Sequence, residues 1–194
     1  MVLGVLDLLY QVLASPPKAF RVVSEKRPLG WAILTAFFTS VVFAYVILPN
    51  PHQLAETIFD LEKGRLNIAP LVLVWLSLFP LALLIQAGLL HAVAVLLRGR
   101  GSYLGMFCGV CFASFPLVFI APLALFRAVL DSGAGQLLYN LVSLVVFLWI
   151  LVLDVMAVRQ NYHFRLRRAV ATCLIPFFLV VVLPPLIVLI SVAF

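Results

Sequence analysis

The sequence has few charged side chains. Asp, Glu, Lys and Arg make up 10% of its 194 residues, whereas hydrophobic residues make up 65%. Soluble domains differ from this composition, because about a quarter of their residues are charged. The proportions exclude an ordinary soluble domain and indicate an integral membrane protein.

Cysteine and histidine are also scarce, with three residues of each. Cys108, Cys111 and Cys173 fall within apolar runs, so no disulfide framework is expected. Cys108 and Cys111 have redox spacing but lack the strand context and the nearby charge of a redox pair, which favours small core residues. The dispersed histidines are His52, His91 and His163. Because no ligand cluster, phosphate loop or nucleophile–base pair has usable spacing, we expect no metal, no cofactor, no catalytic residue and no enzyme.

Apolar runs long enough to cross a bilayer occupy most of the chain, and predict an all-α bundle of five transmembrane helices. The spans are about 30–48, 69–97, 103–126, 137–158 and 169–194. Pro80 lies near the middle of the long second span, where a helix can kink. Pro184 and Pro185 divide the fifth span, so whether its end crosses fully stays open. Residues 30–194 are thus the expected transmembrane domain, and residues 1–29 precede it.

The N-terminal segment is expected to contain an amphipathic helix followed by a basic linker. From Val2 to Ala14 the chain is apolar except for a narrow polar stripe at helical spacing. Too short to span, this helix either lies in the headgroup interface or packs onto the bundle. Pro16 and Pro17 are expected to end it. A second short amphipathic helix, at 50–64, is expected on the opposite membrane surface.

The charged residues lie mostly between the spans and predict the orientation. With the N-terminus inside, ten basic residues are cytoplasmic and three are outside. The ten are Lys18, Arg21, Lys26, Arg27, Arg98, Arg100, Arg159, Arg165, Arg167 and Arg168, and the three are Lys63, Arg65 and Arg127. The positive-inside rule therefore places the N-terminus in the cytoplasm and the C-terminus outside. Topology also explains the basic excess better than nucleic-acid binding does.

Small residues recur at every fourth position on two spans. They are Ala32, Ala36, Ser40 and Ala44 on the first span, and Gly101, Gly105, Gly109 and Ala113 on the third. In lipid such ladders let helix backbones approach closely. We expect the two ladders to pack together and to build the core or a homo-oligomer face. The alternative is that glycine is simply common in membrane helices.

Asp154 is the only acid inside a predicted span. It lies five residues before Arg159, about 8 Å from the cytoplasmic face, at nearly the depth of His91. We hypothesise that Asp154 faces the bundle and pairs with His91, or with Arg98 or Arg100. The candidate polar intramembrane site comprises Gln86, His91, Asn140, Ser143 and Asp154. Such a site is either a proton or cation relay or a structural polar clamp.

Several short motifs occur in a characteristic order. They are Pro17-Lys18-Ala19-Phe20, Gly99-Arg100-Gly101-Ser102-Tyr103, Pro116, the fourth-span end from Trp149 to Leu153, and the basic stretch into Arg168-Ala169. Over nearly its whole length the chain resembles the Yip family, small membrane proteins named for interaction with Ypt/Rab GTPases. It is most similar to bacterial members, which implies a five-span bundle in the bacterial inner (plasma) membrane.

In eukaryotic members the resemblance implies vesicle trafficking and membrane shaping, with small GTPases as partners. This sequence lacks the long cytosolic N-terminal region of those relatives, which argues against a small-GTPase partner. The expected function is a non-enzymatic membrane-organising or partner-binding scaffold. The alternative is a small ion or proton channel, or a transporter, with a pathway lined by polar residues of the second and fourth spans.

The segment from Arg159 to Arg168 is the clearest surface feature. Tyr162 and Phe164 lie among its arginines, a composition that suits anionic headgroups, although positive-inside topology explains it as well. The residues expected to bind headgroups or set topology are Arg98, Arg100, Arg159, Arg165, Arg167 and Arg168. The expected partners are the bilayer, with its anionic lipids, and other membrane proteins or a second copy of the chain; nucleic acid is not expected.

Overall fold

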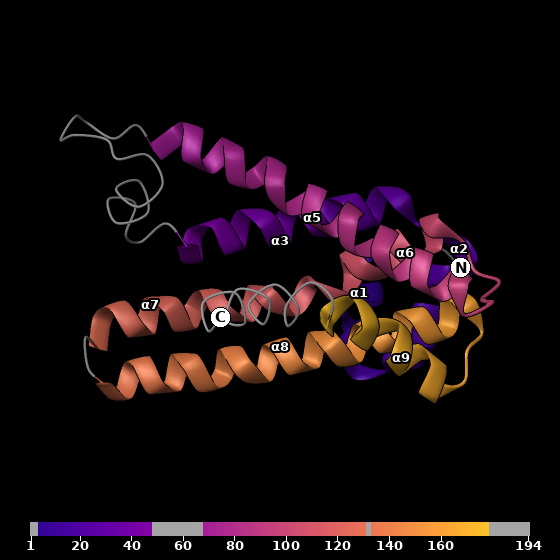
Figure 1. The fold of residues 1–194 in the computed structure, drawn as a ribbon. Coiled ribbons are helices and arrows are strands. Elements are labelled where there is room, and N and C mark those ends of the chain that lie inside the picture. Colours follow the sequence, from indigo (N-terminus) through magenta and orange to yellow (C-terminus); the bar gives the residue numbers. More distant parts are fainter. Residues whose placement is uncertain (1–3, 48–67, 131–132, 179–194) are drawn as a thin grey trace, which may run out of the picture.

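A computed structural model describes residues 4–47, 68–130 and 133–178 of the chain. All regular structure in these residues is helical, which confirms the all-α part of the predicted fold class (Figure 1). The helix expected at 50–64 and the end of the fifth span, 179–194, lie outside the described residues.

The helices form two diverging pairs that meet at a common end (Figure 1). In chain order the elements are α1 (Val5–Ala14), α2 (Pro16–Lys26), α3 (Leu29–Ile47), α5 (Ile68–Leu96), α6 (Tyr103–Ala113), the 3₁₀ turn η1 (Phe115–Phe119), α7 (Ile120–Leu130), α8 (Gly133–Tyr162) and α9 (Leu166–Phe177). α3 packs against α5, and α7 packs against α8. The common end, where α1, α2, α6 and α9 gather, is called the basic end below (Figure 1). It carries Lys18, Arg21, Lys26, Arg98, Arg100, Arg165, Arg167 and Arg168.

α2 takes the place of the expected basic linker. It begins with Pro16 and Pro17, which a helix tolerates in its first turn because the N–H groups there have no intrahelical partner. Ala19, Phe20 and Val23 are buried, and α2 packs against α6 and α8. The linker prediction is therefore wrong, since burial of its apolar face stabilises this segment as a helix.

α1 presents two different apolar faces. Leu8 and Val12 are buried in the hydrophobic core, and the helix contacts α2 and α6. Leu6 and Tyr10, on another face, are 77% and 72% exposed. The helix therefore packs onto the bundle, and its exposed face stays free for the headgroup interface.

Pro116 divides the predicted third span. α6 ends at Ala113, and the 3₁₀ turn η1 separates it from α7. The proline ring removes one backbone donor and blocks a continuous α-helix. The hydroxyl of Ser114 donates to the carbonyl oxygen of Cys111 over 2.8 Å, which satisfies one of the carbonyls at the end of α6.

The two longest helices keep most of their predicted bounds. α5 continues through Pro80 as one helix. α8 begins at Gly133 and ends at Tyr162, so it extends beyond the predicted 137–158 at both ends. Because α7 runs to Leu130 and α8 begins at Gly133, the loop between α7 and α8 is shorter than the sequence indicates.

Three segments among the described residues are long and apolar enough to cross a membrane: Val72–Leu96, Tyr103–Ala124 and Gly133–Tyr162. A shorter apolar stretch, Leu29–Ala44, belongs to α3. The protein is therefore a helical membrane protein, and the count of five spans stays a prediction.

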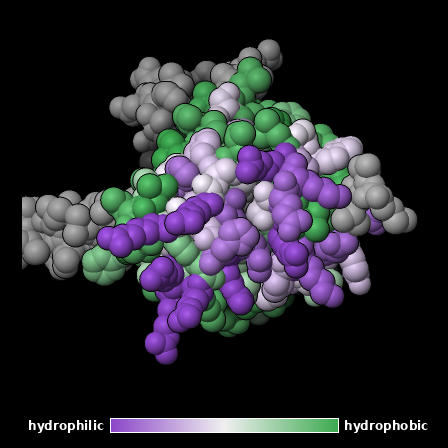
Figure 2. Space-filling view, turned by 90° about the vertical axis from the view of Figure 1, so that its right-hand side faces the viewer, coloured by the Kyte–Doolittle hydropathy of each residue, from purple (hydrophilic) through white to green (hydrophobic). Residues whose placement is uncertain are grey.

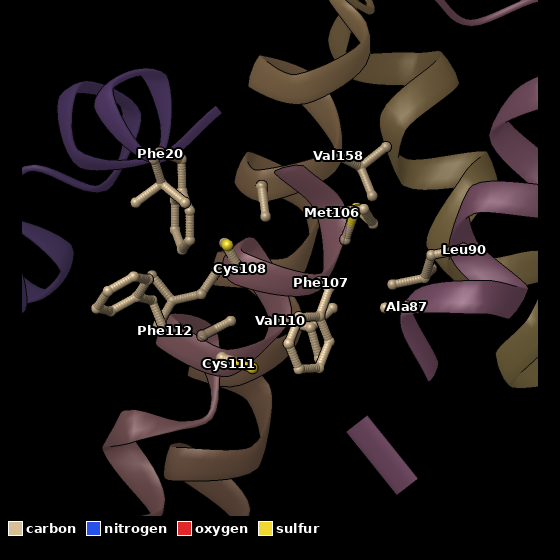
Figure 3. Close-up of a cluster of buried hydrophobic side chains, with 14 of the residues drawn as sticks. Phe20, Ala87, Leu90, Met106, Phe107, Cys108, Val110, Cys111, Phe112 and Val158 are labelled. Carbon is tan, nitrogen blue, oxygen red and sulfur yellow. The ribbon is translucent and has the colours of Figure 1, made fainter. Parts of the chain in front are cut away.

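The hydrophobic core surrounds α6. Every residue from Gly105 to Ala113 is buried. Figure 3 shows Met106, Cys108 and Phe112 of α6 among side chains contributed by other helices, including Phe20 of α2. Val158 of α8 and Ala87 and Leu90 of α5 complete this cluster. Cys108 and Cys111 are unpaired and fully buried, as expected of small core residues.

The surface separates into an apolar body and a hydrophilic end. Large apolar side chains are exposed along α3, α5 and α8, as lipid contact requires. Figure 2 looks directly onto the basic end and shows hydrophilic residues gathered over it, with hydrophobic residues around the margin. This separation fits a helix bundle whose basic end lies at the headgroup level.

Candidate functional site

The buried carboxylate of Asp154 is hydrogen-bonded to an amide. Gln86 Nε2 donates to Asp154 Oδ2 over 2.8 Å and thereby ties α5 to α8. Asp154 is 4% exposed, and its second oxygen, Oδ1, has no hydrogen-bond partner in the described part of the chain. The hypothesis that Asp154 pairs with His91, Arg98 or Arg100 is wrong.

α8 is also longer than the sequence predicts. The sequence predicts an end at Val158, but α8 continues to Tyr162. Asp154 therefore lies eight residues from the end of its helix, a rise of about 12 Å. The carboxylate of Asp154 instead meets Gln86, which precedes His91 by five residues on α5.

His91 has a different partner on α8. Its Nδ1 lies 2.6 Å from the hydroxyl oxygen of Tyr162, within hydrogen-bonding distance. The imidazole also contacts the ring of Tyr103 edge-on, with centroids 5.8 Å apart. The Tyr103 hydroxyl donates to the carbonyl oxygen of Leu84 over 3.3 Å. Three helices, α5, α6 and α8, are thus joined by one aromatic cluster.

Asn161 is a polar residue of this centre that the sequence analysis missed. It is 6% exposed, and its Nδ2 donates to the carbonyl oxygen of Ser102 over 2.9 Å. The Ser102 hydroxyl in turn accepts a hydrogen bond from the backbone N–H of Gly105 and caps α6. Asn161 follows Asp154 by seven residues, which places both on one helix face and was the available signal.

The loop between α5 and α6 rests directly on the end of α8. A Cβ at Gly99 would come within 2.7 Å of the Phe164 ring, and a Cβ at Gly101 within 2.5 Å of the Asn161 carbonyl oxygen. Tyr162 and Phe164 are buried beneath this loop, with their rings stacked at a centroid distance of 5.8 Å. The glycines let the loop cover these two aromatic residues, which therefore belong to the core of the basic end.

Asn140 and Ser143 do not join the polar centre. Asn140 is exposed and accepts a hydrogen bond from Gln136 Nε2 over 2.8 Å. The buried Ser143 hydroxyl has no hydrogen-bond partner among the described residues. Eleven residues of α8, a rise of about 16 Å, separate Ser143 from Asp154. The five candidate residues of the polar intramembrane site therefore do not form one site, because, of these described residues, only Gln86 and Asp154 bond to each other.

The glycines of α6 pack against α8. A Cβ at Gly109 would lie 2.9 Å from the Cβ of Ala157, and a Cβ at Gly105 would collide with the side chain of Asn161. α3 also contacts α6, and Ala113 is buried. The small residues of α3 are buried as well; they are Ala32, Ala36, Ser40 and Ala44. The predicted pairing of the two ladders is wrong for Gly105 and Gly109, whose close neighbour is α8.

Basic residues surround the turn between α8 and α9. A surface hollow of about 570 Å³ is lined by His163, Phe164, Arg165, Arg167 and Arg168. The loop that carries Arg98 and Arg100 lies beside this turn, because Gly99 packs on Phe164. The carbonyl oxygen of Arg159 accepts a hydrogen bond from the N–H of Phe164 over 3.1 Å and closes the end of α8.

The arginines at this turn have no carboxylate partner in the described part of the chain. Among the described residues, the one ion pair joins Arg21 to Glu25 on the exposed face of α2, at 3.0 Å. The described residues also hold no group of three His, Cys, Asp or Glu side chains that could bind a metal ion. The basic end therefore presents positive charge that is available to external anions.

A family model described as the Yip1 domain matches residues 10–189 of the chain. No curated protein matches the sequence, and no solved structure matches the fold.

Proposed function

The chain belongs to the Yip1 domain family, and we propose that it acts as a non-enzymatic scaffold that organises the membrane or binds membrane partners. It does so with its basic end against the anionic headgroups of one leaflet. The observation that carries this proposal is the gathering of arginines at one end of an apolar bundle, where they have no carboxylate partner among the described residues.

Electrostatics support contact with anionic lipids. Arg165, Arg167 and Arg168 line one hollow, and Arg98 and Arg100 lie on the neighbouring loop. Each basic residue near an anionic surface contributes about 1 kcal/mol of attraction, so a cluster of this size favours anionic over neutral lipid.

The use of the buried polar groups supports a scaffold rather than a pathway. Gln86 bonds to Asp154, His91 lies at hydrogen-bonding distance from Tyr162, and Asn161 bonds to the Ser102 carbonyl. These contacts join helices to one another at successive depths. A channel or transporter would instead need polar groups that continue through the bilayer and face water.

The orientation is part of the proposal. With the basic end cytoplasmic, α2, the α5–α6 loop and the α8–α9 turn all lie on the side that the positive-inside rule favours. The membrane we propose is a bacterial inner membrane. The exposed apolar face of α1, with Leu6 and Tyr10, would then enter the cytoplasmic headgroup layer beside the arginines.

Lipid composition around the extracted protein tests this proposal. The full chain is extracted with its surrounding lipid into polymer-bounded nanodiscs, and the phosphatidylglycerol and cardiolipin content is compared with that of the whole membrane. We expect enrichment of anionic lipid by about twofold or more, since a few kT of attraction is concentrated at one leaflet.

A control on the predicted opposite side isolates the basic end. The triple variant Arg165→Gln, Arg167→Gln, Arg168→Gln should lose most of the enrichment. The double variant Lys63→Gln, Arg65→Gln removes positive charge from the segment predicted on the other side and should retain it. Equal lipid content in nanodiscs and membrane, or enrichment that survives the triple variant, would refute the headgroup contact.

A further inference from the structure

A cleft at the membrane-facing side of the bundle lies between α5, α8 and α9. Its volume is about 350 Å³, which is within the range of sites for small ligands, about 300–1,000 Å³. Ile85 and Leu89 of α5 and Phe177 of α9 contribute to its apolar wall. Asp154 and Gln86 supply its polar groups.

The carboxylate in this cleft is only half satisfied. Gln86 donates to Oδ2, whereas Oδ1 is buried without a hydrogen-bond partner in the described chain. An ionised carboxylate buried with a single amide donor is strongly disfavoured unless a cation or further donors complete it. The chain supplies no such cation among the described residues, because their one ion pair is Arg21 with Glu25.

We propose that this cleft binds a lipophilic primary ammonium, with its alkyl chain along the apolar wall and its ammonium group at the carboxylate of Asp154. A primary ammonium has three N–H donors and a positive charge, so it supplies both the hydrogen-bond donor and the charge that this carboxylate lacks. The apolar wall selects an alkyl amine over a hydrated inorganic cation, because few oxygen ligands line the cleft.

The surrounding groups determine the selectivity. The other polar side chains that line the cleft are the amide of Gln86 and the thiol of Cys173. Neither carries positive charge, so an alkyl carboxylate would meet Asp154 without compensation. An alkyl alcohol offers one neutral donor, and charge-assisted hydrogen bonds are about twice as strong as neutral ones.

The test uses three probes with the same alkyl chain and different head groups. Dodecylamine, dodecanol and dodecanoate are titrated separately into the full chain in a non-ionic detergent, and native mass spectrometry counts the bound molecules. We expect one dodecylamine per chain, bound at least about tenfold more tightly than dodecanol, and no saturable binding of dodecanoate.

Variants locate the site. Asp154→Asn is nearly isosteric and should abolish the preference for the amine. Asp7→Asn removes an exposed carboxylate from the first turn of α1 and should preserve it. Ala82→Phe places a large ring at the exposed edge of the cleft and should weaken binding of the amine to a folded protein.

Two results would overturn the proposal without reliance on any single variant. Equal affinity of unmodified protein for the amine and the alcohol would show that the carboxylate exerts no charge selection. A preference for the amine that persists in Asp154→Asn, or amine binding that Ala82→Phe leaves unchanged, would place the binding elsewhere on the protein.

Discussion

Gln86 of α5 donates a hydrogen bond to Asp154 of α8 over 2.8 Å, although 68 residues separate them in the sequence. This contact is the deepest of a series that continues toward the basic end with His91 and Tyr162, then Asn161 and Ser102. Each pair joins two different segments of the bundle. The series explains how a protein with little charge fixes the positions of its helices in lipid, where apolar side chains offer little specificity.

Replacing Gln86 should measure the free-energy cost of burying the Asp154 carboxylate without a hydrogen-bond donor. Gln86→Leu leaves Asp154 without its one observed donor, and we expect a loss of about 1–3 kcal/mol in the free energy of unfolding. The double variant Gln86→Leu, Asp154→Leu removes both partners and should recover most of that loss. Unfolding in detergent, followed by circular dichroism, measures both variants.

The matched control is Gln136→Leu. Gln136 donates to Asn140 over a similar distance, 2.8 Å, but this pair is exposed. Its loss should change stability by less than about 0.5 kcal/mol. Equal effects of the two glutamine substitutions would contradict the structural role of the Gln86–Asp154 contact.

The glycine at position 105 should not tolerate a methyl group. A Cβ there would collide with Asn161 and would approach the Ser102 hydroxyl to 2.9 Å, so Gly105→Ala should destabilise the protein by about 1–3 kcal/mol. Gly88→Ala is the control, since its nearest neighbour would be the Tyr103 ring at 4.0 Å. There the higher helix propensity of alanine should stabilise α5 or leave it unchanged.

Thermal unfolding of both variants in the same detergent tests this contrast. Combining Gly105→Ala with Asn161→Ala should restore part of the stability, because the second change removes the side chain that the methyl group meets. Additive destabilisation in the double variant would mean that Asn161 is not the obstacle.

Removing the Tyr162 hydroxyl, which lies against His91, should lower the stability measurably but by less than removing the Gln86 amide. Tyr162→Phe retains the buried ring and removes only the group 2.6 Å from His91 Nδ1. We expect a loss of about 0.5–1.5 kcal/mol in unfolding free energy. Tyr10→Phe, at a residue that is 72% exposed, should have no effect beyond error. A stability unchanged in Tyr162→Phe would remove this hydrogen bond from the account.

α2 should be required for a stable bundle. Phe20 is 1% exposed and lies beside the α6 core, so Phe20→Ala should cost about 3–5 kcal/mol. Phe37→Ala, on the exposed surface of α3, removes the same atoms from a residue that is 52% exposed. Size-exclusion profiles and unfolding midpoints compare the two. If both variants behave alike, α2 would not be part of the core.

The sequence predicted the helical class and most of α5, because long uninterrupted apolar runs specify helices in lipid. It also identified Gln86, His91 and Asp154 as candidates, since polar residues in apolar spans are conspicuous. Their partners could not be predicted from the spacing. Periodicity gives the face of a helix but not how neighbouring helices are shifted along their axes, and that shift makes Gln86 rather than His91 the partner of Asp154.

Two other differences have the same origin in tertiary packing. Pro16 and Pro17 resemble the start of a linker, and only the burial of Phe20 shows why α2 forms. The glycine ladder of α6 predicts that a helix approaches closely, but the spacing does not say which one. Asn161 decides this by filling the space beside Gly105.

The most direct test of the scaffold is ion and proton flux through the purified protein in liposomes, with Asp154→Asn measured in parallel. The account predicts no flux of protons, common cations or anions above that of empty liposomes, with or without the substitution. Flux through the unmodified protein that Asp154→Asn abolishes would contradict it and would make the buried carboxylate part of a transport pathway.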